Sequence, residues 1–157
     1  MEILVVLFIV STALLGVLSL IIQNIKVQNI NRNNLIASSL SQEGIELVRQ
    51  LRDDNWQNNL AYDYGLASNY YRVDYRTNEL FPVSTPEETA LYLKDGFYVH
   101  QYSADGLLEP TIFSRRIAIT KLTSEIGQPL QVRSIVSWTD HSRPAHYELQ
   151  TLLYDWR

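Results

Sequence analysis

The hydrophobic residues of this chain follow three successive patterns, and the first is a continuous run. Residues 3–22 are twenty consecutive uncharged residues, mostly Leu, Val and Ile. A helix of that length spans about 30 Å, the thickness of the hydrocarbon layer of a bilayer. No basic residue precedes Ile3 and no Ala-x-Ala follows Ile22, so the run does not fit a cleaved signal peptide. We expect a retained membrane helix.

The second pattern has a helical period. After Ile22, apolar residues recur at spacings of three and four through an amide-rich segment up to Leu51. No proline occurs in residues 1–81, and Gly16 and Gly44 are the only weak points, each costing about 1 kcal/mol relative to Ala. The pattern predicts one helix that continues to about Asp54. Its first half would lie in lipid, and its second half would pack one face against the rest of the chain.

The third pattern has a period of two, which is typical of half-buried strands. Alternation begins near Tyr70 and places Tyr71, Val73 and Tyr75 opposite polar neighbours. An Asp95-Gly96 pair between apolar runs predicts a hairpin over residues 91–100. Longer strands are expected over 112–122, 130–139 and 145–156. We therefore predict an α+β fold, in which one long helix precedes four to six antiparallel strands.

Composition divides the chain at the same place. Of the first 22 residues, 17 are apolar, whereas all but one of the 17 aromatic residues lie at or beyond Trp56. The net charge of −4 and the lack of a basic tail disfavour a nucleic acid partner for this chain alone. There is no cysteine, which excludes disulfides, thiolate metal ligands and a thiol nucleophile. We predict three segments, residues 1–22, 23–56 and 57–157.

The acidic residues near the end of the predicted helix admit two interpretations. They could bind a metal ion or act as acid and base, or they could pair on the helix surface. Surface pairing is favoured because Glu46 lies three residues before Arg49 and four before Gln50, and no histidine is near. The carboxylates concerned are Glu43, Glu46, Asp53 and Asp54.

Other constellations give weak signals for chemistry. His100, His141 and His146 could ligate zinc, but their spacing matches no ligand motif. A triad of Asp140 and His141 with Ser137 or Ser142 lacks a Gly-x-Ser-x-Gly elbow. The Asp53-Asp54-Asn55 run lacks the ligand spacing of a calcium loop. We predict no enzymatic activity, metal or cofactor.

Ten tyrosines between Tyr62 and Tyr154 are the clearest hint of surface chemistry. An aromatic face suits adhesion and stacking on sugars. The same residues could instead pair across strands and fill a small sheet against the helix, which is the favoured interpretation.

Glu2 is an acidic side chain at the start of the apolar run. Such a residue is costly at a membrane and is a functional hypothesis by default. It could simply lie among lipid headgroups, or it could need a positive partner when helices pack together. The obvious partner is a chain-terminal amine, its own or a neighbour's.

The sequence Glu2-Ile3-Leu4-Val5-Val6-Leu7, followed by a long apolar run, resembles the N-terminal segment of type IV pilins and type II secretion pseudopilins. In that family the matching carboxylate pairs with the N-terminal amine of an adjacent subunit and sets axial register. The resemblance implies that Glu2 has this role. It also implies a membrane and filament-core role for Ile3, Leu4, Val5, Val6, Leu7, Phe8, Leu14, Leu15, Leu18 and Ile21.

The family's precursors carry a short basic leader ending in Gly, which this sequence does not show. Met1 stands where the residue before the Glu is expected, so we expect a later assigned start or a trimmed sequence. Processing by prepilin peptidase and N-methylation are implied by the resemblance alone. Lys26 and Arg32 follow the run, which by the positive-inside rule would place the body in the cytoplasm. A basic leader would reverse that orientation, and the resemblance favours a body outside.

The resemblance extends along most of the chain. Residues 43–56 are similar to the Glu-Gly-Ile-Glu-Leu-Val-Arg end of the long helix in minor-pilin-like proteins. Residues 110–117, 136–138 and 152–157 look like successive strands of the same family. The fold implied is pilin-like, with a long N-terminal helix packed on a small antiparallel sheet. The C-terminal disulfide loop of many pilins cannot form here.

The resemblance implies a structural subunit of a type IV pilus or related type II secretion-like filament, most similar to a minor pilin. Its partners would be other pilin subunits, the inner-membrane assembly machinery and the lipid bilayer. It would span the inner membrane once, with its body outside the cytoplasm, and reach the cell surface on assembly. The alternative is a single-span membrane-anchored binding or adhesion domain that never polymerises.

Overall fold

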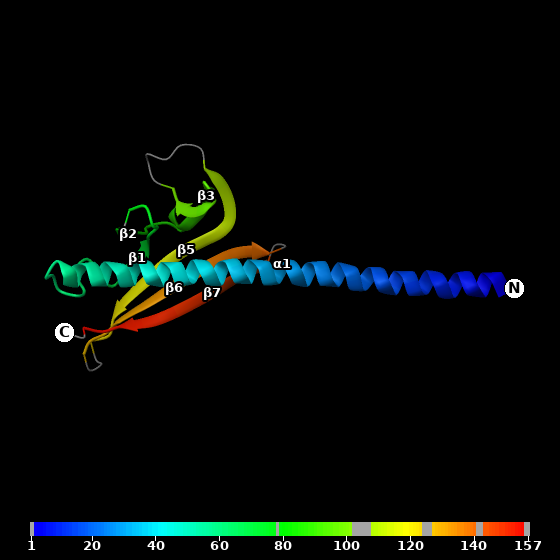
Figure 1. Cartoon of the computed structure of the whole chain (residues 1–157), viewed down its shortest axis with the longest axis horizontal. Coiled ribbons are helices and arrows are strands. Elements are labelled where there is room, and N and C mark those ends of the chain that lie inside the picture. The colour runs from blue at the N-terminus through cyan, green and yellow to red at the C-terminus, as the bar shows by residue number, and fades with distance from the viewer. Residues whose placement is uncertain (1, 78, 102–107, 124–126, 141–142, 156–157) are drawn as a thin grey trace. The chain divides into compact units, whose positions relative to one another are not determined.

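The structure, a computed structural model, describes residues 2–77, 79–101, 108–123, 127–140 and 143–155. Helix α1 (Glu2–Gln57) comes first, and the short 3-10 helix η1 (Pro86–Thr89) lies between strands (Figure 1). The strands among the described residues are β1 (Asn69–Arg72), β2 (Phe81–Pro82), β3 (Ala90–Lys94), β4 (Phe97–His100), β5 (Glu109–Lys121), β6 (Leu130–Asp140) and β7 (Arg143–Leu153). The predicted α+β class is confirmed.

The chain forms two compact units, Met1–Leu35 and Ile36–Arg157. Helix α1 includes residues of both units, and Gly16 does not interrupt it. In the second unit, the part of α1 from Ile36 onward packs against the antiparallel sheet. The predicted functional boundaries at residues 22 and 56 stay predictions.

Helix α1 ends in a Schellman motif, three residues beyond the predicted end at Asp54. The amide of Leu60 donates to the carbonyl of Asn55 at 2.8 Å, and the amide of Asn59 donates to the carbonyl of Trp56 at 3.1 Å. Asn59 takes a left-handed conformation with φ of 57°, which asparagine tolerates better than most residues. The motif turns the chain away from the helix axis, so the segment that leads to β1 starts here.

The long strand β5 organises the sheet. Along one edge it pairs with β6 from Phe113 to Lys121. Along its other edge, its first half pairs with β3 and its second half with β1. The sheet is extended by three further strands, because β2 pairs with β1, β4 with β3 and β7 with β6. All pairs are antiparallel. The spatial order of the strands therefore does not follow their order in the chain, because the 13 residues of β5 can accommodate two short strands on one edge.

The predicted strands differ from the observed ones mainly at their ends. The hairpin at Asp95-Gly96 is confirmed, with φ values of 52° and 84° that fit a type I′ turn. Strand β1 ends at Arg72, so the prediction that the strand includes Val73 and Tyr75 is wrong. Strand β7 ends at Leu153, two residues before the described residues stop. Seven short and long strands are present in the described part, one more than the upper expectation.

The core lies between α1 and the inward face of the sheet. Near the end of α1, Ile45 and Val48 pack with Ile117 and Val132. Nearer the start of the second unit, a second cluster joins α1 to β5 and β6 and comprises Ala37, Leu40, Leu91, Phe113, Val136 and Trp138. All residues of both clusters lie within the second unit.

Candidate functional site

The predicted membrane and filament-core residues lie on the first unit, and all are solvent-exposed there. Their exposed fractions range from 50 % for Ile21 to 76 % for Ile3. Among the described residues, α1 is the one helix long and apolar enough to cross a membrane, and no part of its most apolar stretch is buried. A continuous apolar surface of this size marks an interaction with lipid or with other helices. Glu2 is exposed at the start of this surface.

The apolar stretch contains two hydroxyl side chains whose hydrogen bonds are made within the helix. The Ser11 hydroxyl donates to the Phe8 carbonyl at 2.9 Å, and the Thr12 hydroxyl donates to the same carbonyl at 2.7 Å. Hydroxyls that bond back to the preceding turn can enter an apolar environment without an unpaired donor. These two residues are therefore compatible with burial in lipid or between helices.

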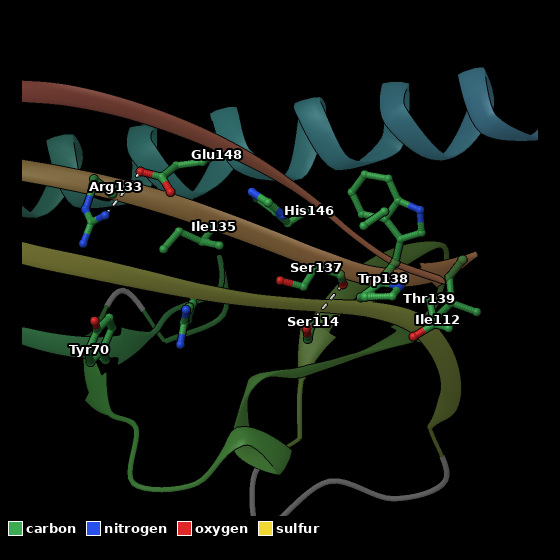
Figure 2. Close-up of a pocket in the computed structure, with 13 residues that line it drawn as sticks. Tyr70, Ile112, Ser114, Arg133, Ile135, Ser137, Trp138, Thr139, His146 and Glu148 are labelled. Atoms are coloured by element: carbon green, nitrogen blue, oxygen red, sulfur yellow. Dashed lines mark hydrogen bonds and ion pairs between the residues drawn. The ribbon is translucent and has the colours of Figure 1, made fainter. Parts of the chain in front are cut away.

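A second candidate site lies on the sheet face opposite α1. Here β5, β6 and β7 line a shallow cleft of about 530 Å³, together with Tyr70 from β1 (Figure 2). An adjoining recess of about 370 Å³ is bounded by residues 83–86 and Thr89. The two hollows share Tyr70, Ser114, Arg116, Ile135 and Ser137. We call this combined surface the outer cleft.

Strand register explains how the outer cleft forms. Ser114 lies opposite Ser137, which lies opposite His146, so one row crosses three strands. The next row, two residues along, comprises Arg116, Ile135 and Glu148. Residues two apart on a strand share a face, so both rows point away from α1. The pattern that buries Phe113 and Ile117 against the helix thus leaves Arg116, His146 and Glu148 exposed on the outer face.

The charges of the outer cleft are partly paired. The guanidinium of Arg116 lies 5.1 Å from the centre of the Tyr70 ring. Arg133 is 3.4 Å from a carboxylate oxygen of Glu148, a long contact between two partly exposed groups. The Ser114 hydroxyl donates to the Ser137 carbonyl at 3.3 Å.

A buried polar cluster connects α1 with the sheet. Arg115 is 1 % exposed, and its guanidinium donates to the carbonyls of Leu40 at 3.1 Å and Val73 at 2.7 Å. The same guanidinium is 3.1 Å from Glu43, a partly exposed carboxylate on α1. These partners compensate for the desolvation of a charge that is expensive to bury alone. The cluster thus ties α1 to the sheet through one buried guanidinium.

Asp74 and His100 extend the buried cluster. Asp74 is fully buried and accepts hydrogen bonds from the backbone amides of Arg76 at 3.0 Å and His100 at 3.1 Å, and from the Arg76 guanidinium at 3.0 Å. Burial and, after it, the charge of Arg115 lower the pKa of His100 to about 3, although the charge of Asp74 acts in the opposite direction. His100 is therefore neutral at physiological pH. The bonds of Asp74 also explain why β1 stops at Arg72, because its carboxylate organises a turn there.

Several sequence predictions about chemistry can now be placed. The pair Glu46–Arg49 is confirmed, with an oxygen–nitrogen distance of 2.6 Å. Glu43 instead binds Arg115 across the interface with the sheet. His100 is buried in the core while His146 lies on the outer face, so these two do not share a site. His141 and Ser142 lie outside the described residues. In the described ranges, no three His, Asp or Glu side chains are grouped to hold a metal ion.

The tyrosines divide between the two interpretations that the sequence left open. Tyr71 is buried, and Tyr98 packs edge-on against Phe113 with ring centres 6.0 Å apart. Other tyrosines are exposed, namely Tyr64, Tyr70, Tyr75 and Tyr154.

No protein-family model, curated protein or solved structure matches this chain.

Sequence reasoning found the apolar stretch but missed the outer cleft and the buried charges. Arg115 has the same strand parity as Phe113 and Ile117, so its inward position could have been read from the alternation along β5. The burial of Asp74 could not be read from the alternation around Tyr71, because the strand ends before Asp74. The outer cleft depends on which strands become neighbours, and no local pattern contains that information.

Proposed function

We propose that this chain is a structural subunit of a type IV pilus or a related type II secretion-like filament, similar to a minor pilin. The observation that carries the proposal is the position of Glu2. It stands at the start of an exposed apolar helical stretch, and the same helix later packs on an antiparallel sheet. The resemblance of residues 2–7 to the pilin N-terminus gives this arrangement its interpretation.

In the proposed mechanism, the apolar surface of residues 3–22 lies first in the membrane and later in the interior of the filament. Before assembly, residues 3–22 lie in the inner membrane, and the body lies outside the cytoplasm. An assembly machine then extracts the subunit, and the apolar helices of neighbouring subunits bury one another in the filament. A carboxylate left alone in that apolar interior would be costly. Pairing of Glu2 with a neighbour's terminal amine removes the cost and fixes the axial position of the subunit.

The test replaces Glu2 in cells that produce the filament. Glu2→Ala is expected to lower the amount of this protein in sheared surface filaments by about tenfold or more. The substitution leaves the neighbour's terminal amine unpaired in the apolar interior, which costs several kcal/mol. The amount in the membrane fraction is expected to stay unchanged. Quantitative immunoblots of both fractions measure the two quantities.

Two further variants sharpen the test. Glu46→Ala removes an exposed carboxylate from the same helix, 2.6 Å from Arg49, and is expected to assemble normally. Glu2→Asp retains the charge and is expected to assemble better than Glu2→Ala. Normal incorporation of Glu2→Ala would overturn the pairing mechanism.

A second candidate is a membrane-anchored binding domain that does not polymerise. The outer cleft favours it, because small ligands bind in hollows of this size at which several polar groups converge. The two candidates differ in where the wild-type protein is found. A filament subunit appears in sheared surface fractions, whereas an anchored domain stays entirely with the membrane.

A further inference from the structure

The outer cleft contains two arginines, and only one of them pairs with a carboxylate of the described residues. Arg133 has Glu148 nearby, but Arg116 makes no ion pair with any residue that the structure describes. The whole chain has a net charge of −4, so a positive side chain in the cleft differs in sign from the chain as a whole. A guanidinium binds carboxylates through two parallel hydrogen bonds, which makes an anionic group its natural ligand.

The guanidinium of Arg116 is also held in place. Its contact with the Tyr70 ring at 5.1 Å restricts a side chain that would otherwise be mobile. Arg116 and Tyr70 belong to both hollows of the outer cleft, so the charge lies where a ligand that occupies either one would meet it. A restrained side chain loses less entropy on binding than a free one.

The remaining lining groups suit a polyhydroxylated ligand. The hydroxyls of Ser114, Ser137 and Thr139 and the imidazole of His146 can both donate and accept hydrogen bonds. Ile135, in the middle of the second row, supplies an apolar floor. Figure 2 shows Ser137, His146 and Ile135 gathered over the central strands. Sugars combine hydroxyls with apolar ring faces, so this mixture matches them.

An extended peptide fits the outer cleft less well. Peptides that bind sheets usually add a strand at a free edge. The cleft lies over β5, β6 and β7, and its central strand β6 is paired with β5 on one side and with β7 on the other. The backbone groups of β6 are therefore already used, and side chains alone remain to bind a ligand.

We propose that the outer cleft binds a short acidic saccharide whose carboxylate pairs with Arg116 and whose hydroxyls bond to Ser114, Ser137 and His146. The combined hollows, of about 530 and 370 Å³, are within the usual size range of ligand sites. Because the cleft is shallow, binding is expected to be weak, with a Kd on the order of 1 mM or somewhat below. The site does not depend on polymerisation.

The experiment titrates the full chain, purified in detergent, with trigalacturonate and follows binding by isothermal calorimetry. The neutral galactose trisaccharide and a short poly-glutamate are the comparison ligands. Arg116→Gln is expected to weaken trigalacturonate binding by about tenfold or more, the usual effect of losing a charge-assisted pair. Arg49→Gln makes the same change of charge on α1, away from the cleft, and is expected to bind like the wild type.

The outcomes separate the ligand classes. Binding of trigalacturonate that exceeds both comparison ligands and requires Arg116 supports the proposal. Equal binding of the neutral sugar would show that the carboxylate is not recognised, and preferential binding of poly-glutamate would favour an acidic peptide. Either result overturns the proposal, as does absent binding of trigalacturonate or unchanged binding by Arg116→Gln. Near-UV circular dichroism establishes that each variant is folded.

Discussion

At the scale of single residues, the buried charges of the second unit are the most informative. Arg115 satisfies carbonyls on both α1 and the segment after β1, so one side chain ties together parts of the chain far apart in sequence. Replacing a buried ion pair by apolar residues can be neutral, but removing one partner leaves the others unsatisfied. The same charge helps to keep His100 neutral.

The neutral state of His100 predicts a pH dependence of stability. Its pKa is lowered to about 3 in the folded chain from an ordinary value of 6.5, so between these values the unfolded chain binds the proton more strongly. The free energy of unfolding is therefore complete above pH 6.5 and falls as the pH falls toward 3. We expect a loss of about 2 kcal/mol between pH 7 and pH 5. Urea unfolding in detergent, followed by near-UV circular dichroism, measures it.

Substitution identifies the group responsible for this loss. His100→Leu is expected to flatten the pH dependence between pH 5 and 7. The ring nitrogens of His100 make no hydrogen bond with the residues that the structure describes, although the Ala90 backbone is near enough to favour the charged form slightly. Leucine therefore breaks no such bond. His146→Leu removes an exposed histidine as a control. An unchanged slope in His100→Leu would assign the pH dependence to other groups.

At the scale of elements, the contact between α1 and the sheet depends on a close approach at Gly44. From sequence, this glycine is a weak point of the helix. In the structure, a methyl group at this position would meet the Ser134 hydroxyl at 2.5 Å and the Ile117 side chain at 2.7 Å. Glycine thus permits the helix to lie against β5 and β6, and its cost in helix propensity is offset by packing.

Gly44→Ala is accordingly expected to destabilise the body, although alanine is the better helix former. Overpacking of this kind costs about 1–3 kcal/mol, which urea unfolding of the full chain in detergent would measure. Gly16→Ala is the matched control, because a methyl group there would contact nothing within 4 Å. The double variant Gly44→Ala with Ile117→Val removes one clashing atom and is expected to recover part of the loss. A Gly44→Ala chain as stable as the wild type would contradict this account.

At the scale of the whole molecule, the two units have different requirements. The first exposes its apolar side chains and needs lipid or other helices to cover them. The second contains both core clusters, and every buried residue of those clusters lies between Ala37 and Leu153. Its stability is therefore expected not to require the first unit.

A fragment comprising residues 36–157 tests this independence. We expect it to be soluble without detergent, monomeric in ultracentrifugation, and to retain the thermal unfolding midpoint of the full chain within a few degrees. The full chain is expected to partition into membranes or detergent. An unfolded or aggregated fragment would show that the body needs the first part of α1.

Local patterns predicted most elements because each element is defined by neighbours in sequence. The helical period up to Leu51, the Asp95-Gly96 turn and the alternation along β6 gave three elements close to their observed positions. The ends were less predictable, since β1 stops where Asp74 finds bonds with Arg76 and His100. His100 lies 26 positions from Asp74 in the sequence, so no local pattern predicts their contact.

The sequence by itself determined the apolar stretch, the position of Glu2 before it and the α+β class, because hydrophobic period and turn chemistry are local properties. Tertiary structure alone decided that β1 and β3 share one edge of β5, that Asp74 is buried, and that Arg116 meets Tyr70 in an outer cleft. These features arise when strands distant in sequence become neighbours. Their physical cause is long-range pairing, which positions side chains that no single segment brings together.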